Sequence, residues 1–180
     1  MQQILQIIDT IRQFLTEQES PGGFFTNRDK DTAITVAMDT AEDAAEAMLA
    51  YERTPFKQDD IGENYLRLYG FLQAVFLQQD SIKELHERFL KSALNTGKMS
   101  GWTAIRELRN RTTGHPVKHG SVERIFMTRI SLNQWFFQYQ VWNEESHTPL
   151  FDDVNLWALY EAYKEDATSL LRKILDRLGI

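Results

Sequence analysis

The sequence predicts a mainly α-helical protein with a small β-hairpin inserted before its last helix. Over most of the chain, apolar residues recur at steps of three and four, the period of an amphipathic helix. Between residues 122 and 142, runs of β-branched and aromatic residues replace that period. With 42% hydrophobic and 12% aromatic residues, a chain of 180 residues can bury one substantial core. We therefore expect residues 1–180 to form a single domain.

The first part of the chain is expected to be helical. Residues 1–15 carry an apolar stripe that Asp9 and Arg12 interrupt, which predicts an amphipathic helix and not a signal peptide. An alanine-rich helix follows over residues 32–51. Residues 61–79 form the most apolar helix of the chain. Because this helix is apolar on too many sides for a surface position, we expect it at the centre of the bundle.

Two further helices are expected before the hairpin. Ser81 and Glu84 have the spacing of a capping box, which predicts a separate helix that begins at Ser81 and ends near Gly97. A short helix is then expected over residues 102–113, with its apolar residues on one side.

The hairpin predicted over residues 122–142 has its turn at residues 131–134, a largely polar stretch between two runs rich in aromatic residues. The last helix begins at about Val154, and its apolar residues recur at alternating three- and four-residue steps. This spacing forms a packing seam, either inside the subunit or between two subunits.

Charge is distributed unevenly along the chain. The net charge of −6 and the pI near 5.3 argue against a protein coated in basic residues for wholesale nucleic-acid binding. Residues 97–130 nevertheless hold seven Lys or Arg residues and two acidic ones, a net charge of +5, which leaves −11 for the rest. Such a patch suits a site that takes a phosphate group or a short polyanion.

The composition also narrows the chemistry and the location. The chain has no cysteine, which excludes a disulfide framework, thiol catalysis and thiolate metal sites. No apolar run approaches the roughly 20 residues that span a bilayer. We therefore expect a cytoplasmic protein that does not contact a membrane.

The most informative segment is residues 109–116, which read Arg-Asn-Arg-Thr-Thr-Gly-His-Pro at the end of the short helix. Gly114 is a natural residue just beyond a helix end. Pro116 forbids continuation of the helix and biases His115 towards an extended conformation. This spacing allows the side chains of Arg109 and His115 to converge. An arginine and a histidine are the residue types that hold a phosphate and move a proton.

These residues resemble the motif of the HEPN superfamily, in which an arginine and a polar residue are followed by a histidine a few positions later. Arg109, Asn110 and His115 match that pattern, and the continuation through Pro116 to Lys118 is similar to one subset of the superfamily. The resemblance implies an all-α bundle with the motif late in the chain, on or just after an inner helix. The predicted hairpin departs from the minimal bundle.

The resemblance also implies a function. Many HEPN proteins are metal-independent endoribonucleases of toxin or phage-defence systems, and they typically dimerise so that two motifs face one cleft. Others have lost catalysis and bind RNA, a nucleotide or a partner protein. For this chain we therefore expect an RNA endonuclease without metal or cofactor. RNA, a second copy of the chain and a possible antitoxin or regulatory protein are its expected partners.

Elementary chemistry assigns roles within the motif. Cleavage of RNA by its own 2′-hydroxyl needs a proton-transfer group that works near neutral pH and a cation on the phosphate, which His115 and Arg109 would supply. Asn110 would position the hydroxyl or His115, which completes the predicted catalytic set. His119, a candidate second proton-transfer group, ranks below His115 because it is not a motif position. The predicted substrate-binding residues are Arg106, Arg111, Thr113, Lys118 and His119.

Other interpretations are open. An arginine and a histidine at a helix end can simply cap carbonyls and interact with the helix dipole. A magnesium-dependent nucleotide pyrophosphatase would use acidic helix faces, although a solvated surface explains those acids more simply. His86 and His147 lack partners at metal-ligand spacing and are expected to be surface or structural residues. The acids in question are Asp39, Glu42, Asp43, Glu46, Glu84 and Glu87.

The aromatic residues of the predicted hairpin also allow two interpretations. Their rings can stack on nucleic-acid bases, but a hairpin that packs on a helical bundle needs the same residues for its core or for an interface. We expect the core or interface role. The residues are Trp135, Phe136, Phe137, Tyr139 and Trp142.

Overall fold

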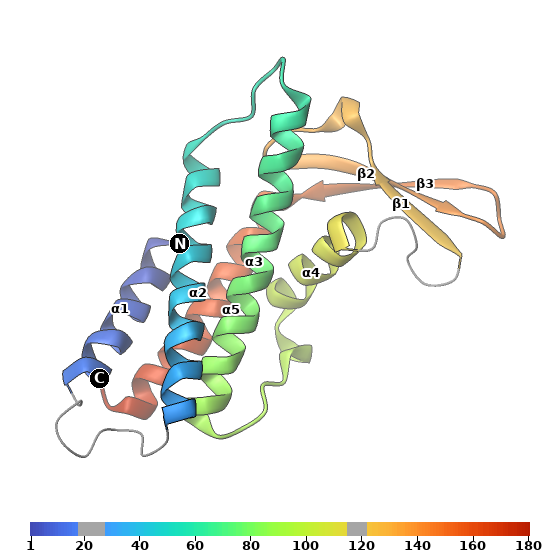
Figure 1. Cartoon of the computed structure of the whole chain (residues 1–180). Coiled ribbons are helices and arrows are strands. Elements are labelled where there is room, and N and C mark those ends of the chain that lie inside the picture. The colour runs from blue at the N-terminus through green and yellow to red at the C-terminus, as the bar shows by residue number, and fades with distance from the viewer. Residues whose placement is uncertain (18–27, 115–121) are drawn as a thin grey trace.

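Four helices pack in a bundle from which a three-stranded sheet projects at one end (Figure 1). The structure is a computed structural model that describes residues 1–17, 28–114 and 122–180, with no side-chain description for residues 28–31. In cyclic order around the bundle, the helices are α1 (Gln2–Glu17), α2 (Arg28–Arg53), α3 (Ile61–Leu90) and α5 (Leu156–Leu178). The shorter helix α4 (Ser100–Arg109) packs outside them, against α3 and α5. None of the described helices is long and apolar enough to cross a membrane.

Helix α3 occupies the centre of the fold, as its sequence predicts. It packs against α2, α4 and α5, and its buried apolar residues extend along almost its whole length. Leu68 and Leu72 near its start and Ile82 and Leu85 near its end are all completely buried. Because three elements cover α3, its apolar residues do not need to share a single face.

The predicted helix start at Ser81 is wrong. Ser81 is buried inside α3, which continues without a break to Leu90. Ile82 and Leu85 prolong the buried stripe of the preceding turns, so core packing outweighs the local capping preference. The helix ends at Leu90, is capped by Lys91, whose φ of 53° lies in the left-handed region, and does not extend to near Gly97.

The sheet confirms the predicted hairpin and adds a strand to it. β1 (Glu123–Met127) pairs antiparallel with β2 (Phe136–Asn143), and β2 pairs antiparallel with β3 (Pro149–Asn155). The third strand was not predicted, because its sequence Pro-Leu-Phe-Asp-Asp-Val-Asn lacks a β-branched pattern and most of it is exposed. Val154 is therefore a strand residue. Helix α5 begins two residues later, after Asn155, whose Oδ1 accepts a hydrogen bond from the Ala158 N–H.

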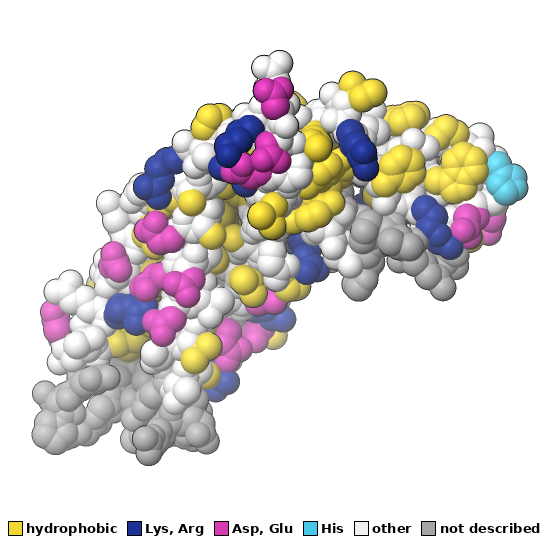
Figure 2. Space-filling model, turned by 45° about the horizontal axis from the view of Figure 1, so that its top comes forward, with side chains coloured by type: hydrophobic (Ala, Val, Ile, Leu, Met, Phe, Trp, Pro, Cys, Tyr) yellow, Lys and Arg dark blue, Asp and Glu magenta, His cyan; other side chains and the backbone are white. Residues whose placement is uncertain are grey.

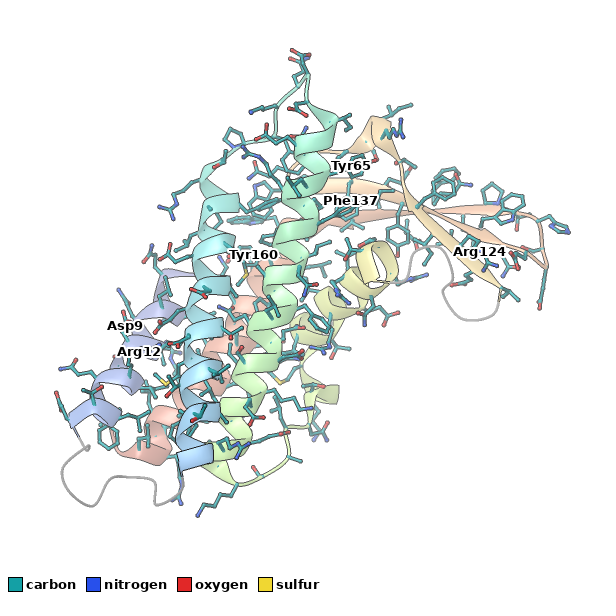
Figure 3. The ribbon with its side chains drawn as sticks, in the orientation of Figure 1. Asp9, Arg12, Tyr65, Arg124, Phe137 and Tyr160 are labelled. Carbon is teal, nitrogen blue, oxygen red and sulfur yellow. The ribbon has the colours of Figure 1, made fainter. Side chains whose placement is uncertain are left out.

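An aromatic cluster joins the sheet to the bundle. The ring of Tyr51 on α2 stacks on Phe71 of α3, with centroids 4.3 Å apart, and its hydroxyl donates to the carbonyl oxygen of Gln134 at 2.6 Å. Trp135 stacks on Tyr160 of α5, with centroids 6.0 Å apart. Phe137 also lies where the sheet meets the helices (Figure 3). The core role expected for these aromatic residues is thus confirmed for Trp135, Phe137 and Tyr139.

The packing seam of the last helix lies inside the subunit. Its apolar residues face α1, α3 and α4 and are buried within one chain. These residues include Tyr160, Tyr163, Ala167, Leu170 and Ile174. The seam is therefore not available as an interface between subunits.

Candidate functional site

Helix α4, which carries the first part of the motif, is fixed by close contacts with its neighbours. A Cβ on Gly101 would lie 2.3 Å from the carbonyl carbon of Ala162, so the backbones of α4 and α5 almost touch there. The Trp102 N–H donates to Asp166 Oδ2 at 2.9 Å. Its carbonyl oxygen accepts a hydrogen bond from the buried Gln79 Nε2 at 2.8 Å. These contacts set the position and direction of α4.

One face of α4 is apolar and buried, which leaves the opposite side for the charged residues. Trp102, Ile105 and Leu108 are buried, in agreement with the sequence prediction. Their three-residue steps place them on the same side of the helix. Arg106 and Arg109 are only partly buried, as are Asn110, Arg111 and Thr113 in the following turn, whereas Thr112 is buried.

The last turn of the motif helix is a π-helical turn, η2 (Asn110–Gly114). The Asn110 N–H is shared between the carbonyl oxygens of Arg106 and Glu107. Threonine hydroxyls occupy two further carbonyls: Thr112 Oγ1 donates to the Leu108 oxygen at 2.7 Å and Thr113 Oγ1 to the Arg109 oxygen at 3.0 Å. Side chains that bond to the preceding turn in this way loosen and bend helices. Turns of this type are frequent at functional sites.

Among the described residues, Arg109 is held by neutral partners. Its Nη2 donates to Gln73 Oε1 at 2.8 Å and its Nη1 donates to Asn110 Oδ1 at 3.1 Å. The guanidinium carbon lies 4.2 Å from the centre of the Phe76 ring, a cation–π contact. Within the described part of the chain, no carboxylate forms an ion pair with Arg109, and its buried Nε has no hydrogen-bond partner. None of the described acids therefore neutralises its charge by an ion pair.

Arg106 and Arg111 differ from Arg109 because each has an acidic neighbour. Arg106 Nη1 lies 2.8 Å from Asp80 Oδ1, and its guanidinium carbon lies 4.1 Å from the centre of the same Phe76 ring. Arg111 Nη2 lies 3.8 Å from Glu123 Oε2. The guanidinium groups of Arg106 and Arg109 thus both contact the Phe76 ring of α3, whereas the guanidinium of Arg111 is directed towards β1.

Arg111 also contacts the inner face of the sheet. Its guanidinium carbon is 5.4 Å from the centre of the Tyr139 ring. Burial raises the pKa of Tyr139 to about 12, and a hydrogen bond to Asp152 acts in the same direction, against the smaller opposing effect of Arg111. Tyr139 is therefore a neutral phenol at pH 7 and not a candidate base.

The remaining predicted site residues divide between the two sides of Gly114. The Thr113 hydroxyl donates a hydrogen bond to the Arg109 carbonyl oxygen, within its own stretch of the chain. A Cβ on Gly114 would lie 2.9 Å from Arg109 Nη1, so the backbone at the end of η2 lies against the guanidinium. His115, Lys118 and His119 lie outside the described residues, and their roles stay predictions.

Three residues of α3 belong to the site and were not predicted. Gln73 and Phe76 hold Arg109, and Gln79 Oε1 accepts a hydrogen bond from Arg106 Nη1 at 3.3 Å. Glutamines at positions 73, 78 and 79 interrupt the most apolar helix of the chain. Because a buried amide must find a hydrogen-bond partner, these glutamines indicate that polar groups of another element contact α3. The identity of the partner, however, depends on tertiary packing.

The acidic helix faces form ion pairs with arginine. Arg12 on α1 bonds to Asp39 and Glu42 of α2, each at 2.8 Å, and it is directed towards that helix (Figure 3). Glu84 pairs with Arg88 at 2.7 Å one turn along α3. In the described ranges, no group of three His, Asp or Glu residues is arranged to hold a metal ion. These contacts are typical of solvated helix faces.

The two described histidines lie apart from the motif contacts. His86 is buried in α3, and its Nδ1 has no hydrogen-bond partner among the described residues. Burial lowers its pKa, and the positive charge of Lys173 lowers it further. His147 is exposed in the turn between β2 and β3, with a φ of 53°. The predicted structural and surface roles fit these positions.

Comparisons of the chain with protein families, with curated proteins and with solved structures found no match.

Proposed function

We propose that this protein is a metal-independent endoribonuclease of the HEPN type, with Arg109, Asn110 and His115 as its catalytic residues. The observation that carries the proposal is the setting of Arg109. Its guanidinium is fixed by an amide, a second amide and an aromatic ring, and no described carboxylate pairs with it. An arginine fixed in this way keeps its full charge for an anionic ligand such as a phosphate.

The proposed reaction is attack of a ribose 2′-hydroxyl on the adjacent phosphorus. The new bond joins O2′ to phosphorus, and the bond from phosphorus to O5′ breaks. The products carry a 2′,3′-cyclic phosphate and a 5′-hydroxyl. His115 takes the proton of the 2′-hydroxyl or gives one to the leaving O5′, and water makes the other of these two proton transfers, while Arg109 stabilises the charge on the phosphate oxygens. Asn110, hydrogen-bonded to Arg109, orients that group.

We further propose that the active form is a two-fold homodimer. A single short patch offers little grip on a polyanion, and two copies facing each other double its charge. The last helix does not supply the contact, because its seam is internal. Leu150 on the edge strand β3 is an exposed apolar side chain that a second copy would cover. Sedimentation should then give about twice the chain mass of 21.0 kDa.

The proposal is tested by incubating the chain with single-stranded RNA in EDTA and analysing the RNA ends. We expect fragments with cyclic phosphate and 5′-hydroxyl ends. Arg109→Ala should lower the cleavage rate by roughly 100- to 1,000-fold. Arg88→Ala, which removes an arginine paired with Glu84 on the α3 surface, serves as the matched control. Activity that EDTA abolishes would favour the pyrophosphatase-like alternative, and RNA binding without cleavage would favour an inactive binding module.

A further inference from the structure

A second surface feature adjoins the motif: a groove between α3 and the edge strand β1. Its volume is about 590 Å³, within the range of roughly 300–1,000 Å³ typical of small-ligand sites. Figure 2 shows hydrophobic side chains gathered where α3 meets the sheet, with basic side chains among them. The groove is lined by Tyr65, Tyr69, Thr112, Ile125, Phe126, Met127 and Arg129.

The walls of the groove are aromatic and partly open to solvent. Tyr69 on α3 is 43% exposed and Phe126 on β1 is 49% exposed. Tyr65, whose position on α3 beside the sheet is visible in Figure 3, lies next to Tyr69, with ring centroids 5.7 Å apart. Burial raises the pKa of Tyr69, and the Tyr65 phenol contributes to the shift, so the hydroxyl remains a hydrogen-bond donor at neutral pH. Rings with a free face and polar groups at the rim suit a flat heterocycle.

The charge of the groove is complementary to an anion. Arg129 is exposed and forms no ion pair or hydrogen bond through its side chain with any other described residue. None of the described lining residues is acidic. A flat apolar slot with one unpaired cation at its rim matches a nucleotide, whose base is planar and whose phosphate is negative.

The position of the groove connects it to the proposed catalytic residues. Thr112, one of its lining residues, belongs to η2 and follows Arg109 by three positions. The side chain of Arg111 between them contacts the sheet at Glu123 and Tyr139. The groove therefore lies beside the turn that directly follows Arg109.

We propose that this groove binds an unpaired base of single-stranded RNA, which stacks on Tyr69 and Phe126 while Arg129 contacts its phosphate. The inference rests on the proposed function in taking RNA as the ligand, but it does not require cleavage. It gives the protein a preference for single-stranded over double-stranded RNA, because a base inside a duplex cannot enter the groove.

The test measures RNA binding without cleavage. The probe is an eight-nucleotide single-stranded RNA with 2′-O-methyl groups, which block attack by the 2′-hydroxyl, and with one 2-aminopurine. Fluorescence anisotropy reports affinity, and quenching of the 2-aminopurine reports stacking. Phe126→Ala and Tyr69→Ala should each weaken binding roughly five- to 150-fold and reduce the quenching. Tyr69→Phe, which keeps the ring, should retain both.

A matched control lies on the same sheet. Phe151 on β3 is 53% exposed and is aligned with Phe126 through Gln140 of β2, but it does not line the groove. Phe151→Ala should leave RNA affinity and quenching unchanged. Thermal unfolding of each variant establishes that it is folded, which the partial exposure of all three side chains favours.

The outcomes separate this inference from the catalytic proposal. If Phe126→Ala and Tyr69→Ala leave the RNA affinity unchanged, the groove does not bind a base, whatever the cleavage assay gives. An equal loss of RNA affinity in Phe151→Ala also contradicts the inference, because the whole face of the sheet, and not the groove, would then contribute to binding. Binding that depends on the groove in a protein that does not cleave RNA contradicts the catalytic proposal alone.

Discussion

Arg109 on α4 donates a hydrogen bond of 2.8 Å to the amide oxygen of Gln73 on α3. This contact joins the predicted motif to the central helix of the fold. It fixes the guanidinium without neutralising it, because an amide carries no charge. A glutamate at the same position would fix the guanidinium equally well and would cancel its charge. That difference gives a direct test of whether the charge of Arg109 is functional.

Gln73→Glu is expected to weaken RNA binding while preserving the fold. The new carboxylate would pair with Arg109 and compete with a phosphate for it. If Arg109 binds a phosphate, the dependence of log affinity on log salt should become shallower by about 0.7 units, the contribution of one phosphate contact in single-stranded nucleic acid. Fluorescence anisotropy at low and at physiological salt concentration provides the measurement. Gln6→Glu, which adds the same charge to the exposed face of α1, is the control and should have little effect.

The basic patch makes a second prediction about salt. If Arg111 and Lys118 contact flanking phosphates, Arg111→Ala and Lys118→Ala should each weaken RNA binding across sequences and flatten the salt dependence by about 0.7 units. Arg111 Nη2 lies 3.8 Å from Glu123 Oε2, so Arg111→Ala also leaves the negative charge of Glu123 without a counter-charge beside the bound RNA. Binding that ignores salt concentration would contradict the phosphate contacts and favour a protein partner.

The close approach of α4 and α5 predicts opposite effects for two glycine substitutions. A Cβ at position 101 would lie 2.3 Å from the Ala162 carbonyl carbon, so Gly101→Ala must force the two helices apart. We expect a loss of about 3 kcal/mol in the free energy of unfolding, the upper end for overpacking. A Cβ on Gly70 of α3 meets no other group within 4 Å. Gly70→Ala should therefore stabilise the protein by about 0.5–1 kcal/mol.

Urea unfolding of both variants measures this difference. A Gly101→Ala variant as stable as the wild type would show that the contact between α4 and α5 does not constrain the helices. The same variant should also cleave RNA more slowly, because α4 carries Arg109.

The buried histidine of α3 predicts a dependence of stability on pH. Burial and Lys173 lower the pKa of His86 in the folded protein below the ordinary value of about 6.5. The unfolded chain therefore binds a proton more readily than the folded one as the pH falls. The contribution of His86 to the free energy of unfolding is therefore fully present above its pKa in the unfolded chain. It is lost progressively as the pH falls through about 6.5 towards the lower pKa of the folded state.

His86→Leu isolates this contribution. The free energy of unfolding is measured about one pH unit above and one below the ordinary histidine pKa for both proteins, and the difference between the two pH values is compared. The wild type should lose more stability on acidification than the leucine variant, since the carboxylates titrate in both. Equal losses would show that His86 is protonated as readily in the folded as in the unfolded state.

Local patterns in the sequence were enough to predict most of the fold. The apolar period located the bundle helices, and the aromatic runs located the hairpin. Two errors have one cause, which is that tertiary packing outweighs local signals. Ser81 looks like a helix start, but the buried Ile82 and Leu85 carry α3 through it. The strand β3 has weak β propensity and forms because β2 offers it a paired edge.

The candidate site was predicted in part. The sequence placed Arg109 and Asn110 at the end of a helix whose other face is buried, and the structure agrees. It did not show that Gln73 and Phe76 hold the guanidinium, because these residues are more than 30 positions away along the chain. Contacts between distant segments follow from the packing of α4 on α3 and leave no periodic signal in the sequence.

The catalytic role of the motif is tested best by the rate at which His115→Ala cleaves RNA in EDTA. His147→Asn, which changes an exposed histidine in the turn between β2 and β3, is the control, since asparagine tolerates the positive φ found there. If His115 transfers the proton, His115→Ala should cleave roughly 100- to 10,000-fold more slowly than the wild type, while the control retains full activity. Equal rates for the wild type and His115→Ala, with both proteins folded, would contradict the assignment of this motif as the catalytic centre.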